Sequence, residues 1–152
     1  MLFFVLLGVL TALAVLGQYA VAHAVAVAAA MRWALSGSLV FFGIDHLRKP
    51  GRYLPMMPAV VPAPRAMVLF TGACELAGAV GLMIPVLRVA AAWALAVYFV
   101  CVFPANIRNA MQGLSTEGLP SARWYYWVRL LFQPIAVWWP LYAAEIITWP
   151  LA

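Results

Sequence analysis

Long apolar stretches, separated by short polar or proline-rich segments, dominate the chain. The first stretch runs over residues 2–47 with few polar interruptions. One straight helix of this length would measure about 69 Å, more than twice the roughly 30 Å hydrocarbon core of a bilayer. Because polar side chains interrupt the stretch around His23, we expect two membrane spans here, at about 2–22 and 27–47.

A proline-rich segment then breaks the apolar pattern. Five prolines alternate with apolar side chains over residues 48–65, and each proline removes a backbone donor and restricts the residue before it. We therefore expect a loop that lies against the membrane interface or folds over the mouth of the bundle as a lid. Three further apolar stretches predict spans at about 66–84, 89–110 and 123–143, with Pro104 kinking the fourth.

Composition agrees with five membrane spans. The chain is 68% hydrophobic and 9% charged, whereas soluble proteins are about 45–50% apolar and about 25% charged. Its continuous Ala- and Leu-rich stretches exclude a transmembrane β-barrel, whose strands alternate with period two. Five spans within 152 residues leave no room for a separate soluble catalytic domain. The expected fold is all-α, one polytopic transmembrane helix bundle over residues 1–152.

The basic residues predict the orientation of this bundle. A formal charge of +5 is spread between the apolar stretches rather than gathered in one patch, which favours topology marking over nucleic-acid binding. Most basic residues lie in the 48–65 loop and on the 111–123 side, and only Arg32 and Arg88 lie on the other side. The positive-inside rule then predicts a cytoplasmic N-terminus and an external C-terminus.

Glu75 is the most prominent polar residue within a span. A charge in hydrocarbon is costly, so such a residue is a candidate functional residue by default. Its neighbours at i±3 and i±4 are small, which allows this face to pack closely on another helix and points Glu75 into the bundle. The alternative is a purely structural hydrogen bond from a protonated carboxyl. The small neighbours are Thr71, Gly72, Gly78 and Ala79.

The last span carries Arg129 and Gln133 at positions i and i+4, on one helix face. Counted from the cytoplasmic end, Gln133 is level with Glu75, and the Arg129 side chain is long enough to cover the remaining offset. Arg129 therefore either forms a buried pair with Glu75 or extends to the cytoplasmic interface. The sequence leaves both alternatives open.

The second and fourth spans bring further polar groups to the same leaflet. Asn106 and Asn109 lie at i and i+3 beside a proline, where they either bond backbone carbonyls freed by the kink or cap the helix locally. Asp45 and His46 end the second span, where a lone histidine is also common as an interfacial residue. Four spans thus place polar groups in one leaflet, which predicts a shared polar cavity.

Cofactor chemistry is constrained by the same spacing. His23 and His46 lie roughly 30 Å apart along the second span and cannot both ligate one haem. Cys74 and Cys101 reach similar depth, where they form either a thiol pair for redox chemistry with a quinone or two small buried apolar side chains. The sequence has no recognisable flavin, haem or metal motif, so electrons would have to come from a partner protein.

The segments around the polar residues resemble the DoxX family of small bacterial membrane proteins. That family shows G-x-x-H-F followed by a proline, then G-x-x-E, and R-x-x-x-Q in its last span. The chain departs from the pattern at Leu47, which stands for the usual Phe, and at Leu131, where a proline is expected. The matching segments, in order over about residues 31–140, are Gly43-Ile44-Asp45-His46-Leu47 with Pro50, the proline-rich stretch 57–64, Thr71-Gly72-Ala73-Cys74-Glu75-Leu76, Val102-Phe103-Pro104-Ala105-Asn106, and Arg129 with Gln133.

The resemblance implies a four-helix core formed by the last four spans, an extra N-terminal helix, and residence in a bacterial inner membrane. The family name derives from terminal quinol oxidase and thiosulfate:quinone oxidoreductase systems, so we expect an accessory or quinone-docking subunit that works with a redox partner. A structural or assembly partner is the alternative, and a small permease is a third. The family's signature polar positions correspond to His46, Glu75, Asn106, Arg129 and Gln133.

Overall fold

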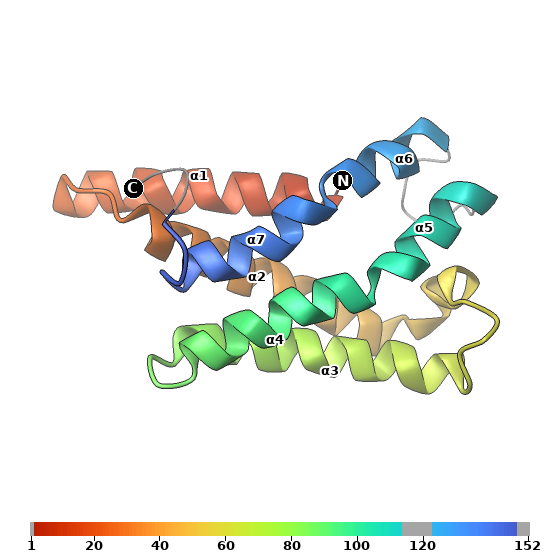
Figure 1. Ribbon diagram of the computed structural model, residues 1–152. Coiled ribbons are helices and arrows are strands. Elements are labelled where there is room, and N and C mark those ends of the chain that lie inside the picture. Colours follow the sequence, from red (N-terminus) through yellow and green to blue (C-terminus); the bar gives the residue numbers. More distant parts are fainter. Residues whose placement is uncertain (1, 114–122, 149–152) are drawn as a thin grey trace.

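A computed structural model describes residues 2–113 and 123–148 of the chain. Every regular element in these two segments is a helix, which confirms the expected all-α class for this part of the chain (Figure 1). In chain order the elements are α1 (Leu2–Ala22), α2 (Val27–Arg48), the short 3-10 turns η1 (Pro50–Arg52) and η2 (Leu54–Met56), α3 (Pro64–Met83), α4 (Arg88–Cys101), α5 (Phe103–Gln112), α6 (Arg123–Leu131) and α7 (Gln133–Ala143).

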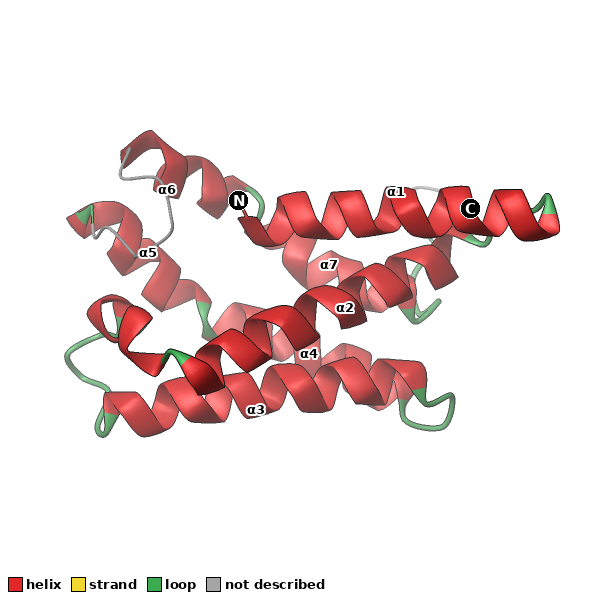
Figure 2. Cartoon of the chain, turned by 180° about the vertical axis from the view of Figure 1, so that it is seen from behind, coloured by secondary structure: helices red, strands yellow, loops and turns green. Residues whose placement is uncertain are grey.

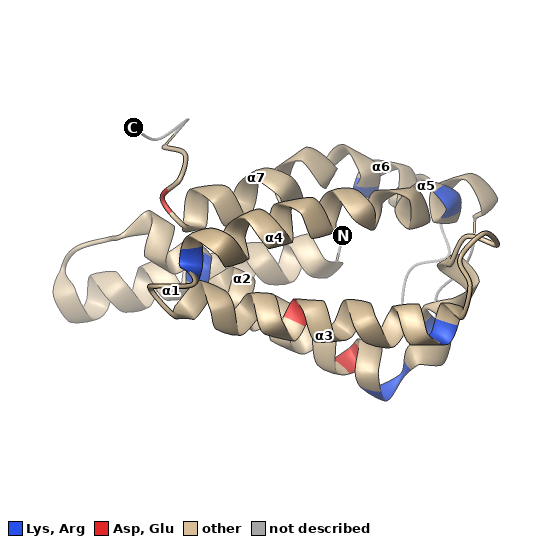
Figure 3. Ribbon diagram, turned by 60° about the horizontal axis from the view of Figure 1, so that its bottom comes forward, with Lys and Arg blue, Asp and Glu red and all other residues tan. Residues whose placement is uncertain are grey.

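The first four expected spans correspond to helices of membrane-crossing length. Within the described segments, α1, α2, α3 and the kinked run of α4 and α5 are long and apolar enough to cross a bilayer. Large apolar side chains such as Trp33, Phe70 and Trp93 are exposed on their outer surfaces, as contact with lipid requires. Figure 3 shows Lys and Arg near the ends of the bundle. The chain is therefore a membrane protein.

The fifth expected span is helical but broken. Its residues form α6 and α7, which are separated at Phe132, two residues before Pro134. The same relation holds between α4 and α5, where Val102 precedes Pro104. A proline lacks the backbone N–H and clashes with the carbonyl one turn earlier, so both helices break at the preceding residues. The kink at Pro104 is confirmed, whereas the break before Pro134 was not predicted. The polar connection between the two broken helices, residues 114–122, lies outside the described residues.

The helices pack around α2. In sequence order, α2 contacts α1, α3 and α7, while α4 packs between α3 and α7. Figures 1 and 2 show α1 along the outside of this group, and α5 and α6 at the same end of the bundle as the turns η1 and η2. Of the side chains of α1, only Leu7 is fully buried. One end of the bundle is thus assembled from segments that lie far apart in the chain.

Small residues let α3 approach both of its neighbours closely. A Cβ added at Gly72 would lie 2.8 Å from the Cβ of His46 on α2. A Cβ added at Gly78 would lie 2.5 Å from the Leu95 side chain on α4. Glu75 lies between these two contacts and is only 6% exposed. The predicted close packing of this helix face, with Glu75 directed into the bundle, is confirmed.

We expect the Gly72→Val substitution to destabilise the protein by about 1–3 kcal/mol, because the added methyl groups must push α2 and His46 away from α3. The matched control is Gly8→Val on α1, since nothing lies within 4 Å of a Cβ added there. Thermal unfolding in detergent micelles, followed by circular dichroism, measures both variants. Equal melting temperatures for the two variants would show that the α2–α3 contact is not tight.

Candidate functional site

A cavity of about 230 Å³ lies at the end of the bundle where η1, η2, α5 and α6 gather. Much of its wall is apolar and aromatic, and this part includes Phe3, Phe4, Phe42 and Phe99. Six of the seven candidate polar residues line the same space, and they come from five different helices. These six residues are Asp45, His46, Glu75, Asn106, Arg129 and Gln133.

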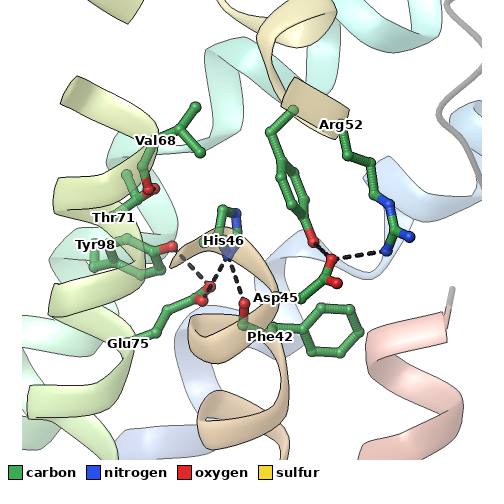
Figure 4. Close-up of polar contacts among 9 residues, drawn as sticks. Phe42, Asp45, His46, Arg52, Val68, Thr71, Glu75 and Tyr98 are labelled. Atoms are coloured by element: carbon green, nitrogen blue, oxygen red, sulfur yellow. Dashed lines mark hydrogen bonds and ion pairs between the residues drawn. The ribbon is translucent and has the colours of Figure 1, made fainter. Parts of the chain in front are cut away.

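The first polar group in the cavity surrounds Glu75. Figure 4 shows Glu75, His46 and Tyr98 turned toward one another from α3, α2 and α4. The Tyr98 hydroxyl donates to Glu75 Oε1 at 2.8 Å, and His46 Nδ1 lies 3.0 Å from Glu75 Oε2. His46 Nδ1 also lies 2.8 Å from the carbonyl oxygen of Phe42. The geometry of a hydrogen bond is met between His46 Nδ1 and the Phe42 carbonyl. Glu75 Oε2 lies close to the imidazole but accepts no well-directed hydrogen bond from it.

The proline-rich loop is attached to this group through Asp45. Arg52 Nη1 donates to Asp45 Oδ2 at 2.8 Å, and the Tyr53 hydroxyl donates to the same oxygen at 2.6 Å. The Tyr53 ring stacks on the imidazole of His46, with centroids 3.9 Å apart. Burial, together with the Asp45 carboxylate, raises the pKa of Tyr53 well above its ordinary value, so the hydroxyl remains a donor. Of the two expectations for this loop, the lid over the bundle mouth agrees with these contacts.

A second polar group joins the broken helices. Arg129 on α6 donates from Nη2 to Asn106 Oδ1 on α5. Asn106 Nδ2 donates to Gln133 Oε1 at 3.4 Å, and Gln133 Nε2 donates to the carbonyl oxygen of Phe99 on α4. Gln133 is 8% exposed. This chain of hydrogen bonds links residues on both sides of the two proline breaks, and its Arg129 end lines the cavity.

Of the two alternatives for Arg129, the buried pair with Glu75 is wrong. The described ion pairs are His46 with Glu75 and Arg52 with Asp45. Depth counting places two residues at one level of a bundle, but it does not say which helices are neighbours. α3 lies beside α2 and α4, whereas α6 packs against α5. The side chains available to Glu75 are therefore His46 and Tyr98, and Arg129 meets an amide of α5 instead.

Asn109 is the candidate residue that does not line the cavity. Its side chain is fully buried and its Nδ2 lies 3.0 Å from the sulfur of Met56 in η2. Asn109 therefore holds the loop against α5 rather than taking part in a polar site. Cys74 and Cys101 are free thiols, one half-buried and one exposed, and neither lines the cavity.

Three polar residues of the site were missed by sequence reasoning: Arg52, Tyr53 and Tyr98. A tyrosine inside an apolar span is a usable signal, because a buried hydroxyl needs a partner. Arg32 was also misjudged, since it was considered only as a topology marker. It is 8% exposed, and its Nη1 has no hydrogen-bond partner among the described residues. Arg32 lies about 20 Å along α2 from Asp45 and so is remote from the cavity.

Fold and site together define a helical membrane-protein bundle that encloses a polar cavity near one end. The chain belongs to the family described as "Domain of unknown function (DUF8561)", whose model matches residues 35–144. The matched region begins inside α2, ends just after α7, and contains all seven candidate polar residues but not α1. No curated protein and no solved structure matches the chain.

Proposed function

We propose that the cavity binds a small amphipathic molecule with a polar head, most directly a quinone. In this proposal the protein is an accessory or quinone-docking subunit of a membrane oxidoreductase system. One observation carries it: polar side chains from five helices and an aromatic wall line the same cavity. Ligand sites of this kind combine a mostly apolar lining with a few placed polar groups.

The aromatic wall suits the flat ring of a quinone. Phe3 on α1 packs against Phe42 on α2 and Phe99 on α4, with ring centroids 5.7 Å and 5.8 Å apart. A planar ring gains contact area and offset stacking against such rings. The lining also includes His46 and Arg129, whose N–H groups suit the carbonyl oxygens of the quinone.

The resemblance to the DoxX family favours the same ligand class, since that family is associated with quinone-dependent oxidases and oxidoreductases. The sequence carries no recognisable flavin, haem or metal motif, so a partner protein would supply or accept the electrons. In a bacterial inner membrane, the basic 48–65 loop would place the mouth of the cavity on the cytoplasmic side, with the N-terminus inside and the C-terminus outside. A docking subunit of this kind would present the quinone head to a cytoplasmic-side partner.

A structural or assembly protein is the second candidate, and one observation favours it. The chain of hydrogen bonds from Arg129 through Asn106 and Gln133 to Phe99 is complete without a ligand. Such a chain fixes the register of four helices on its own. The two candidates differ in whether the cavity binds anything.

The test is binding of a short-chain quinone to the purified protein in detergent micelles, read as saturable quenching of tryptophan fluorescence. We expect His46→Ala to weaken binding by about tenfold, the loss of about 1.4 kcal/mol, because a donor and the stacking partner of Tyr53 disappear. The control is His23→Ala, at an exposed position beyond the far end of α1. His46→Gln provides a second variant that keeps a donor, and thermal melts of the ligand-free proteins verify folding.

Two results would contradict quinone docking. One is the absence of saturable binding to the unaltered protein. The other is binding to His46→Ala that is as tight as binding to His23→Ala and to the unaltered protein, which would place the quinone in the micelle rather than in the cavity. Loss of stability in both His46 variants, without any binding to the unaltered protein, would favour the structural candidate.

A further inference from the structure

The charges that line the cavity do not cancel. At its mouth, Asp45 accepts hydrogen bonds from Arg52 and Tyr53, and the Arg52 guanidinium lies 2.8 Å from the carboxylate. This carboxylate therefore has its own counter-charge and its own donors. The group at Asp45 is neutral as a whole and holds the loop in place.

Glu75 also has its own partners. His46 Nδ1 lies 3.0 Å from Glu75 Oε2, and Tyr98 donates to Oε1. A lone carboxylate at this buried position would be costly, and the imidazole beside it is the basic group placed to balance its charge. Glu75 is therefore already provided with a partner for its charge.

Arg129 is the cation left over among the described residues that line the cavity. Among the described residues, no carboxylate lies within 4.0 Å of its guanidinium, because the ion pairs there belong to His46 and Arg52. Its partner across the helix interface is the neutral amide of Asn106, which accepts one hydrogen bond from Nη2. A guanidinium has five N–H donors in a planar fork, so most of them remain to be satisfied by other groups. The side chain lines the cavity, so these donors are within reach of a bound molecule.

We propose that the ligand of this cavity carries an oxyanion head, which binds to the fork of Arg129 while its apolar body lies against the aromatic wall. The inference rests on the proposed function and makes it more specific: among quinones, the cavity selects those with an ionised ring hydroxyl. In such an anion, the oxygen at the ring hydroxyl position carries part of the negative charge and lies beside a carbonyl oxygen, and a planar fork can bind two such neighbouring oxygens at once. The ligand thereby supplies the counter-charge that the described residues do not give to Arg129.

Three ligands of similar size test this selection at neutral pH: an alkyl-substituted 2-hydroxy-1,4-naphthoquinone, its methyl ether, and decanoate. The methyl ether keeps the ring and loses the charge, and decanoate keeps an oxyanion and loses the ring. We expect the hydroxyquinone to bind at least about ten times more tightly than its ether, because charge-assisted hydrogen bonds to an Arg are stronger than neutral ones. Lowering the pH until the ring hydroxyl is protonated should remove that preference in the unaltered protein.

The variants are Arg129→Gln and Arg129→Lys, with Arg108→Gln as the matched control, since the Arg108 guanidinium bonds Gln112 in an exposed pair. Arg129→Gln should bind both quinones with equal affinity. Arg129→Lys should keep part of the preference for the hydroxyquinone, because it keeps the charge without the fork. Arg108→Gln should behave as the unaltered protein. If thermal melts show that Arg129→Gln does not fold, the affinities of the unaltered protein for the hydroxyquinone and its ether at two pH values decide whether the ligand binds as an oxyanion.

The outcomes separate this inference from the proposed function. Equal affinity for the hydroxyquinone and its ether would overturn the oxyanion head and leave quinone docking standing. Binding of decanoate that depends on Arg129, without binding of either quinone, would support the oxyanion head and overturn the quinone. Absence of binding by all three ligands would overturn both.

Discussion

Glu75→Ala should lower the free energy of unfolding by about 3 kcal/mol, because Tyr98 loses its hydrogen-bond acceptor and His46 loses its ion-pair partner. Tyr98 would be left with an unsatisfied hydroxyl and His46 with an uncompensated ring nitrogen beside it. Each buried polar group left unpaired costs about 1–3 kcal/mol, and breaking a buried ion pair costs about 3–5 kcal/mol. The lower end of these ranges applies because His46 keeps its hydrogen bond to the carbonyl of Phe42.

Unfolding in mixed detergent and SDS micelles, followed by circular dichroism, measures this loss. Glu75→Gln is the graded variant, since an amide oxygen still accepts from Tyr98, and it should lose about half as much. Glu145→Ala is the control, because Glu145 is exposed just beyond α7. A Glu75→Ala protein as stable as the Glu145→Ala protein would show that the polar group around Glu75 contributes nothing to the fold.

Gln133→Leu should have the second largest effect, a loss of about 2–4 kcal/mol. The Gln133 side chain accepts from the half-buried amide of Asn106 and donates to the buried carbonyl of Phe99, so a leucine leaves both groups without this partner, at about 1–3 kcal/mol each and toward the lower end for Asn106. These bonds connect α7 to α4 and α5 across the proline breaks. We therefore expect faster amide exchange near residues 99–103 together with the loss of stability.

Gln112→Leu is the control for this substitution, because the Gln112 side chain accepts from Arg108 in an exposed pair. Exposed pairs of this kind contribute about 0–1 kcal/mol. The same unfolding assay and hydrogen exchange measured by mass spectrometry compare the two variants. Equal stabilities and equal exchange rates would mean that Gln133 does not link the helices.

Features set along a single helix were predictable from the sequence. The spans follow from hydropathy and length, and the kink at Pro104 follows from the lost backbone donor. The inward direction of Glu75 follows from its small neighbours Gly72 and Gly78, because periodicity fixes which side chains share a face. Pro134 carries the same signal as Pro104, so the break in the last span was within reach of the same argument.

Features set between helices were not predictable. Whether Glu75 meets His46 or Arg129 depends on which helices are neighbours around the bundle axis, and hydropathy carries no information on that order. Tyr53 lies over His46 only because the proline-rich loop turns back onto α2, and the contacts of Asp45 that hold it are not visible as a motif. Residue type and depth in the membrane therefore predict which residues belong to the site. Which of them contact one another depends on the order of the helices in the bundle.

The N-terminal helix contributes to the cavity although it lies outside the matched family region. Leu2, Phe3 and Phe4 line the cavity, and the backbone N–H of Leu2 lies 3.4 Å from the Tyr125 hydroxyl on α6. Farther along α1, one side of the helix packs on α2 while the other side is exposed, and its single fully buried side chain is Leu7. The first turn of α1 thus completes the aromatic wall to which we assign the ring of the ligand.

Quinone docking requires that polar groups of separate helices and an aromatic wall form one internal chamber that accepts a ligand. Photoaffinity labelling with an azidoquinone, followed by peptide mapping, tests this most directly. We expect saturable labelling at lining positions that are far apart in the chain, such as Phe3, Phe42 and Met57. Unlabelled quinone should suppress that labelling. Labelling confined to outward-facing positions of α1, such as Val9 and Leu16, and unaffected by competitor would contradict quinone docking.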